Sequence, residues 1–339
     1  MALFAAYSYV KLALLYKDEG ATYSFFKKSF PNNELASSVI GWLIVFGYIS
    51  TLALYAFTFA SYFCSQIETL NHPIWQKIIA GLIISLFAIV NLVSVKGMGK
   101  MEDILVYSKI VILLFISGLL SGKGDIQNLL PVFESQTTLT QILIVSAITF
   151  VAYEGFQLVI HAYNEMDNPQ KNIPKAIYSS IGIATILYLI LSIAALSTIP
   201  KEMIIEDKEY ALAAGAGTFL GQFGRFIVIF GALLATSSAI SLLATGGLQV
   251  ILEFGSITFI IVSLLMAYTN YKKRIETKSS LAITLTALVG LLLAGLLIIY
   301  FEFNENKEQF IYILIIYILL GIGAFFYSKK SKTNAQQNI

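Results

Sequence analysis

The sequence predicts an all-α integral membrane protein, and three observations support that prediction. Of the 339 residues, 57% are hydrophobic and 12% are charged, and that charged fraction is about half of what a soluble domain carries. The mean hydropathy is +0.78. Apolar runs recur along the whole chain, and many approach the roughly 20 residues that a transmembrane helix needs. Such an apolar surface must face lipid as well as other protein.

These apolar runs place the predicted helices in order. Residues 1–16 are apolar apart from Lys11, and they lack the basic start and the small-residue cleavage site of a signal peptide. Two later runs, 104–122 and 135–164, each contain one charge. The charge-free runs are 35–67, 78–95, 176–200, 226–252, 254–271, 279–301 and 309–328. With the N-terminal piece, they predict about ten membrane helices.

Composition argues against several functional classes. The net charge is +2, and no basic block with interleaved aromatic residues suggests nucleic-acid binding. Cys64 is the only cysteine, which excludes an internal disulfide, and two histidines leave little for a metal site. Neither a serine–histidine–acid arrangement nor a glycine-rich phosphate loop stands out. We therefore expect no enzymatic activity, no metal and no cofactor.

The run 135–164 is unusual because its single charge, Glu154, lies in its apolar centre and is followed by Gly155. An ionisable group at membrane depth usually faces a cavity or a partner. Glycine lets the backbone leave helical geometry, and a broken helix near the bilayer midplane indicates a transporter binding site. The alternative is an intact helix in which a protonated glutamate packs against its neighbours. Spacing alone does not separate the two.

Two neighbouring motifs resemble a known family. Residues 149–156 read TFVAYEGF, and residues 164–177 read NEMDNPQKNIPKAI. Together they look like the sixth helix and following loop of amino acid permeases of the amino acid–polyamine–organocation superfamily, and they favour the broken helix. In the loop, Asn168 and Pro169 predict a turn, Asn172 a helix cap, and Pro174 a position in the first helical turn.

The resemblance implies a LeuT-like inverted-repeat helical bundle that is incomplete. Residues 20–23, which read GATY, match a run that follows the second helix in the family, so we expect the chain to start inside that helix and to lack the first. Residues 231–247 resemble the eighth helix and 249–271 the tenth, which leaves the ninth missing near Leu248. One permease domain would span 1–328. It would comprise half-repeats at 1–122 and 139–271 and two peripheral helices at 279–328.

The resemblance also implies a substrate site. The unwound centre of the family's sixth helix corresponds to Tyr153, Glu154, Gly155 and Phe156, where the backbone contacts the amine end of an amino acid and aromatic side chains close over it. The carboxylate of the substrate would bind to N–H groups of the first helix. Other aromatic residues, such as Trp42, Trp75 and Tyr271, are more typical of anchors at the membrane interface.

Three further residues are candidates for proton coupling. The resemblance places Lys109 where permeases of this type often have a lysine in the fifth helix, in place of the sodium ion of sodium-coupled relatives. The alternative is that Lys109 snorkels toward Asp103, about 9 Å away along a helix. Ser237 and Ser238 lie in the eighth helix near that cation site. Alternatively, either serine bonds to its own helix backbone or packs at a helix contact.

The predicted function is secondary transport of amino acids or related amines across the cell membrane, coupled to protons. The alternative is a non-transporting permease remnant, or a subunit that needs a partner chain to supply the missing helices. Lysine and arginine accumulate in the cytoplasmic loops of membrane proteins. Their distribution in this sequence predicts that Lys278 is cytoplasmic and that residues 329–339 form a disordered cytoplasmic tail. That sidedness requires either 226–247 or 249–271 not to cross the membrane. The polar stretch 200–224 would be an external loop with a short helix.

Overall fold

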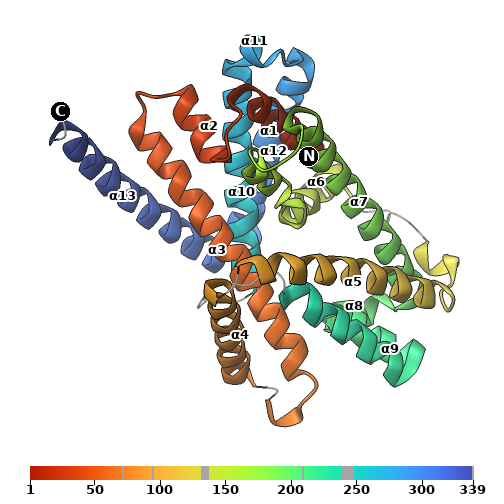
Figure 1. Cartoon of the computed structure of the whole chain (residues 1–339). Helices are drawn as coiled ribbons and strands as arrows, with labels where there is room; N and C mark the ends of the chain where they lie inside the picture. The colour runs from red at the N-terminus through yellow and green to blue at the C-terminus, as the bar shows by residue number, and fades with distance from the viewer. Residues whose placement is uncertain (71, 94, 131–136, 208–209, 238–247, 338–339) are drawn as a thin grey trace. The chain divides into compact units, whose positions relative to one another are not determined.

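The computed structural model describes residues 1–339 except 71, 94, 131–136, 208–209, 238–247 and 338–339 (Figure 1). The described residues form helices joined by turns and short loops, with no strand among them, which confirms the all-α prediction. The chain divides into two compact units. Unit 1 comprises residues 1–48, 138–182 and 252–339, and unit 2 comprises 49–137 and 183–251. Each unit therefore draws segments from both predicted half-repeats.

Unit 1 contains the elements around the predicted site. It includes the start of α3 (Glu34–Cys64), the start of α7 (Pro169–Thr198) and α10 (Leu248–Lys272) from residue 252 onward. Its other elements are α1 (Ala2–Tyr16), α2 (Ala21–Ser29), α6 (Leu139–Ile148), the 3-10 helices η3 (Thr149–Tyr153) and η4 (Phe156–Ala162), α11 (Arg274–Thr277), α12 (Leu281–Glu305) and α13 (Lys307–Gln337).

Unit 2 contains the remainder of α3 and α7 and the first residues of α10, 248–251. Its other elements are η1 (Glu68–Leu70), α4 (Pro73–Val93), α5 (Val95–Ser121), η2 (Ile126–Leu129), α8 (Lys201–Asp207) and α9 (Ala211–Ser237). The packing of α5 against α9 forms its core, in which Ile116 and Leu120 lie with Val228 and Ile229. The hydroxyl of Thr198 donates to the Leu120 carbonyl over 2.8 Å and ties α7 to the end of α5.

Most of the helices overlap the predicted membrane segments, whereas the predicted run 226–252 includes residues 238–247, which lie outside the described residues. Seven helices in the described part of the chain are long and apolar enough to cross a bilayer, and three shorter apolar helices, Ala2–Tyr16, Pro73–Leu86 and Val106–Ser121, accompany them. The long ones are Glu34–Cys64, Leu139–Ala162, Pro169–Thr198, Ala211–Leu233, Glu253–Lys272, Leu281–Glu305 and Lys307–Lys329. The protein is thus a multi-pass membrane protein, while the expected absence of the first and ninth helices and the sidedness of Lys278 stay predictions.

Three boundaries differ from the sequence predictions. Helix α9 begins at Ala211, inside the stretch expected to be a loop, and contains a non-helical residue at Gly221, where φ is 71°. Helix α13 continues to Gln337, so residues 329–337 of the predicted tail are helical rather than disordered. Helix α7 begins at Pro169, which therefore occupies the first helical position, and Pro174 lies inside the helix instead of in its first turn. Asn172 does not precede this helix; its side chain donates back to the Asp167 carbonyl over 2.6 Å.

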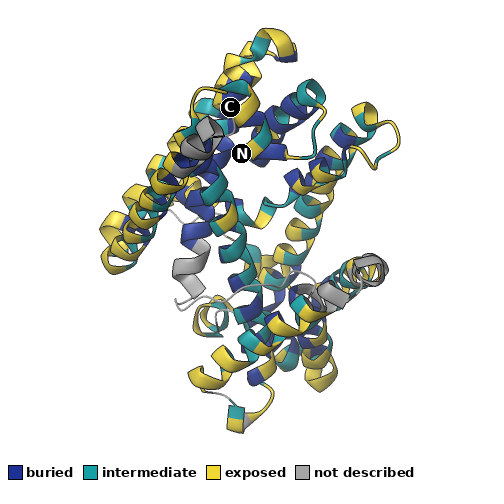
Figure 2. Ribbon diagram, turned by 60° about the vertical axis from the view of Figure 1, so that its left-hand side comes forward, coloured by how far each residue is buried: buried dark blue, intermediate teal, exposed yellow. Residues whose placement is uncertain are grey.

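Helix α10 is the most enclosed membrane segment. In an apolar 18-residue window of its span Glu253–Lys272, 72% of the residues are buried, against 17–33% in the corresponding windows of the other long spans. Figure 2 shows buried residues in dark blue and exposed residues in yellow. Several polar side chains of α10 are consequently paired inside unit 1. For example, Thr258 shares a hydrogen bond of 2.7 Å with the Tyr317 hydroxyl. Helix α12 packs against α6 and α1 through a buried stripe, and the assignment of 279–328 as two peripheral helices stays a prediction.

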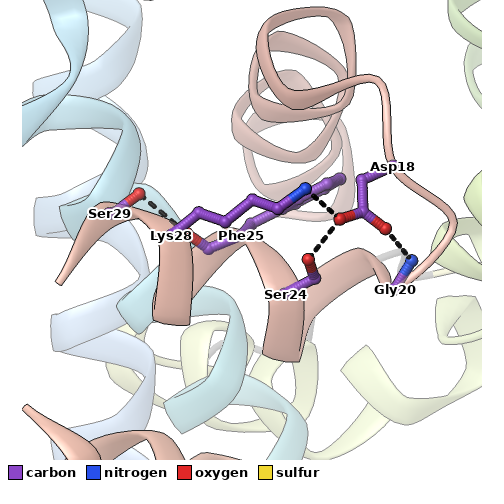
Figure 3. Close-up of polar contacts among 6 residues, drawn as sticks. All are labelled: Asp18, Gly20, Ser24, Phe25, Lys28 and Ser29. Atoms are coloured by element: carbon purple, nitrogen blue, oxygen red, sulfur yellow. Dashed lines mark hydrogen bonds and ion pairs between the residues drawn. The ribbon is translucent and has the colours of Figure 1, made fainter. Parts of the chain in front are cut away.

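Asp18 fixes the turn between α1 and α2 (Figure 3). Its carboxylate accepts hydrogen bonds from the Lys28 ammonium, from the Ser24 hydroxyl at 2.5 Å and from the Gly20 backbone N–H at 2.7 Å. Lys28, followed by Ser24, holds the pKa of the Asp18 carboxyl below its usual range, at about 2. The ionised carboxylate therefore stabilises the turn at neutral pH.

The contact between α3 and α10 gives one stability prediction. A side chain at Gly47 would meet Thr258 Cγ2 at 3.1 Å and Phe259 Cζ at 3.2 Å, whereas one at Gly290 on α12 would meet no atom within 4 Å. We expect Gly47→Leu to lower the melting temperature of the purified protein because close helix packing in membranes needs small residues. Gly290→Leu should leave it unchanged or raise it. Equal effects of the two substitutions would contradict this packing.

The Asp18 turn gives a second prediction. The stabilisation from a carboxyl with a depressed pKa is present above about pH 4 and is lost as the pH falls through the folded-state pKa. We expect Asp18→Asn to lower the melting temperature at pH 7, and the difference from the wild type to shrink as the pH falls toward 2. The effect should be small because the carboxylate is partly hydrated. A difference that is constant with pH would rule out this role of the charge.

Candidate functional site

The predicted helix break is present in unit 1. Helix α6 ends at Ile148, and the chain continues through the 3-10 helix η3 to Tyr153. Glu154 is extended, with φ −66° and ψ 146°, and Gly155 has φ 115°, in the region that only glycine enters readily. The 3-10 helix η4 then begins at Phe156. The sequence prediction of a broken rather than an intact helix is therefore confirmed.

Neighbouring groups satisfy part of the backbone that the break releases. The Ser256 hydroxyl of α10 donates to the Ile148 carbonyl over 2.7 Å, and the Glu154 N–H donates to the Val151 carbonyl over 3.1 Å. Without water, an unpaired backbone group at membrane depth costs several kcal/mol. The irregular backbone is therefore stable because protein, and α10 above all, surrounds it.

Gln157 connects the two sides of the break. Its side-chain amide donates to Glu154 Oε2 over 2.7 Å and to the Tyr48 hydroxyl over 3.2 Å. Its carbonyl oxygen accepts from the Gly155 N–H at 3.1 Å. The residue is only 3% exposed, so water does not replace these bonds easily. Gln157 thus holds the Glu154 carboxylate and the Gly155 backbone in one arrangement.

Aromatic rings border the same region. Phe156 packs edge-to-face against Tyr9 of α1, with ring centroids 5.5 Å apart, and Tyr48 packs against Phe259 of α10 at 5.7 Å. Beside Gly155, by contrast, the position of a Cβ atom has no heavy atom within 4 Å. The glycine backbone therefore borders open space, whereas the residues on either side are packed.

Glu154 has one oxygen available for a ligand. Oε2 accepts from Gln157, but Oε1 is buried and accepts no hydrogen bond from the part of the chain that is described. A buried acceptor of this kind is energetically unfavourable until a donor reaches it. The ammonium group of an amine is a small cation with three donors and fits this requirement.

The structure brings together only some of the predicted site residues. Tyr153, Glu154, Gly155 and Phe156 are consecutive in unit 1, with Tyr153 half-buried at the end of η3. Lys109 lies half-buried on α5 of unit 2. Ser237 is the last residue of α9, and its side chain lies outside the described part of the structure, as does the whole of Ser238. The proton-coupling role of these three residues stays a prediction.

Sequence reasoning missed three residues of this site. Tyr9 and Tyr48 belong to the many aromatic residues that suggest interface anchors, yet Tyr9 is 1% exposed and Tyr48 bonds to Gln157. Gln157 itself carried one usable signal, because it follows Glu154 by three residues in an apolar run. Trp75 and Tyr271, by contrast, are exposed, as expected of anchors.

The Gln157 contacts give a testable prediction. We expect Gln157→Leu to destabilise the protein by roughly 1–3 kcal/mol, because the Glu154 carboxylate and the Gly155 N–H lose a buried partner. Chemical denaturation of the purified protein measures this difference. Gln170→Leu, at an exposed position of the same unit, is the matched control and should have little effect. A Gln157 variant as stable as this control would contradict the bridging role.

Comparison with known proteins agrees with the structure. An uncharacterized protein from Methanocaldococcus jannaschii is 33% identical over 258 residues, which cover 74% of this chain and 57% of the relative. The inner membrane transport protein YbaT from Escherichia coli is 29% identical over 244 residues, covering 71% and 56%. The methylthioribose transporter from Bacillus subtilis is 29% identical over 213 residues, covering 58% and 45%.

The chain thus spans little more than half the length of the first two of these relatives, 57% and 56%. The family description "Amino acid permease" matches residues 1–337, which is almost the whole chain. The match includes the two motifs around the helix break. The chain therefore belongs to the amino acid permease family.

Proposed function

We propose that the protein transports amino acids or related amines across the cell membrane, and that their amine group binds at the break between α6 and η4. The observation that carries this proposal is the buried Oε1 atom of Glu154, which has no donor among the described residues. A substrate ammonium would supply one. Transport moves the substrate without making or breaking a covalent bond, so the proposal involves no enzymatic step.

The surroundings of Glu154 support an amine rather than an anion. The carboxylate repels a substrate carboxylate, so the amine end must face it. The open space beside Gly155 gives that end access to the backbone, and Phe156 and Tyr9 provide an apolar edge. Broken helices that line a midplane site are the usual binding element of secondary transporters.

Protons are the proposed driving ions, with Lys109 as the coupling group. A half-buried lysine in a membrane helix can exchange a proton as its environment changes. If it only snorkels, its substitution should not affect coupling. We therefore expect Lys109→Ala to remove the stimulation of uptake by an inward proton gradient. Gradient-driven uptake that Lys109→Ala leaves unchanged would refute the coupling role.

Uptake of pooled labelled amino acids into proteoliposomes tests the substrate site. We expect the wild type to accumulate label under an inward proton gradient. Glu154→Gln should reduce uptake at least about tenfold, because a charge-assisted hydrogen bond of roughly 1.5–3 kcal/mol is lost. Glu165→Gln, at an exposed glutamate in the following loop, is the control and should retain uptake. Wild-type uptake with full activity in Glu154→Gln would disprove the assigned site.

The second candidate is a permease that transports only with a partner chain, or not at all. It is motivated by the comparison with the first relatives, because the matched residues cover little more than half of each of them. A folded, monodisperse preparation that takes up none of the labelled pool would favour this candidate. Uptake restored by co-reconstitution with a chain that supplies the family's first helix would favour the partner-dependent form.

A further inference from the structure

Two glutamates outside the proposed substrate site meet at the contact between α10 and α12. The two helices run antiparallel within unit 1, and two contacts fix their register. The Asn270 side chain donates to the Thr284 hydroxyl over 3.4 Å, and a Cβ atom at Gly295 would lie 3.5 Å from Ile260 Cγ2. Two helical turns farther along each helix, about seven residues, the same register brings Glu253 opposite Glu302.

Both carboxyl groups are enclosed at this position. Glu302 is 0% exposed and Glu253 is 2% exposed. Glu302 ends the buried stripe of α12, which begins at Thr284 and faces the interior of unit 1. The Glu253 carboxyl lies within interaction range of the Glu302 carboxyl, and the Asn306 side chain lies nearby. The two acids thus form a pair that protein separates from solvent.

The carboxyl of Glu302 lacks a donor in this environment. Neither of its oxygens accepts a hydrogen bond from the residues that the structure describes. The Tyr317 hydroxyl on α13 is already shared with Thr258. The charged residues at the turn into α13, Glu305, Lys307 and Glu308, are all exposed. The charged group that acts on Glu302 is therefore Glu253, which is itself an acid.

Two adjacent buried carboxylates cannot both stay ionised, because each is desolvated and they repel each other. A single proton on one of the two carboxyls removes this repulsion and neutralises one of the buried charges. The protonated acid becomes a donor, and its O–H bonds to the remaining carboxylate. A metal ion would instead need about six oxygen ligands in an ordered shell, whereas a proton needs only the two facing carboxyls.

We propose that Glu253 and Glu302 hold a single proton between them and so form a proton-binding site in unit 1, separate from Glu154. The site lies close to the end of α12, only a few residues from the exposed turn at Glu305, through which the proton can exchange with water. The proposal does not depend on the protein's transport activity. It adds a second group, besides Lys109, whose protonation can change with pH.

Infrared spectroscopy of the full chain in lipid nanodiscs tests the shared proton. We expect the wild type at neutral pH to show a carboxylic-acid carbonyl band that Glu302→Gln and Glu253→Gln each remove. Glu305→Gln, at an exposed glutamate three residues along the same helix, should retain the band. A wild-type spectrum from which neither substitution removes any carboxylic-acid intensity would overturn the proposal. The Glu253 variant keeps the test informative if the Glu302 variant does not fold.

The pH dependence of thermal stability provides an independent measurement. A folded protein that holds a proton on this pair binds more protons than the unfolded chain at neutral pH, so its stability falls as the pH rises. We expect Glu302→Gln to flatten this decline, which begins above the ordinary glutamate pKa of about 4.3, whereas Glu305→Gln should follow the wild type. The same decline in Glu302→Gln would overturn the proposal. Stabilisation of the wild type alone by added sodium or calcium would also overturn it, because a metal ion would then replace the proton.

Discussion

The hydrogen bond from Ser256 to the Ile148 carbonyl makes the candidate site possible. A helix that stops inside a membrane leaves backbone groups with no water to bind, and only protein can satisfy them. Helix α10 provides that protein. It is the most buried long span of the chain, and its polar side chains point into unit 1 instead of toward lipid. The break, Gln157 and Glu154 therefore depend on a helix about 100 residues later in the sequence.

The same dependence explains why α10 carries so many buried polar groups. Ser256 contacts the break, Thr258 contacts Tyr317, and Asn270 contacts Thr284. Glu253 extends this series to an ionisable pair with Glu302. In hydrocarbon, each of these groups would be costly if α10 shifted or rotated. Helix α10 therefore fixes the register of the helices around it, and the two proposed ionisable sites of unit 1 share it as their support.

Much of the fold could be predicted from sequence because lipid imposes a simple rule. Long apolar runs must form helices, and the Glu154–Gly155 pair marks the break within one of them. Contacts between distant helices were not predictable. Nothing in the sequence around Glu253 indicates its partner, Glu302, because that residue lies on another helix. Tyr9 and Tyr48 likewise resembled interface anchors until their burial and contacts were known. The length of α9 was underestimated because glycines at positions such as 215 and 217 resemble a loop, although the helix contains them.

If Glu154 binds the amine of the substrate, the thermal stability of the protein must depend on that amine. The purified protein would be melted with amino acids and with their N-acetyl derivatives, which keep the side chain and carboxylate but lack the ammonium group. We expect free amino acids to raise the melting temperature of the wild type, N-acetyl derivatives to leave it unchanged, and Glu154→Gln to abolish the difference. Equal stabilisation by both kinds of ligand, or an unchanged response of Glu154→Gln, would contradict this role of Glu154.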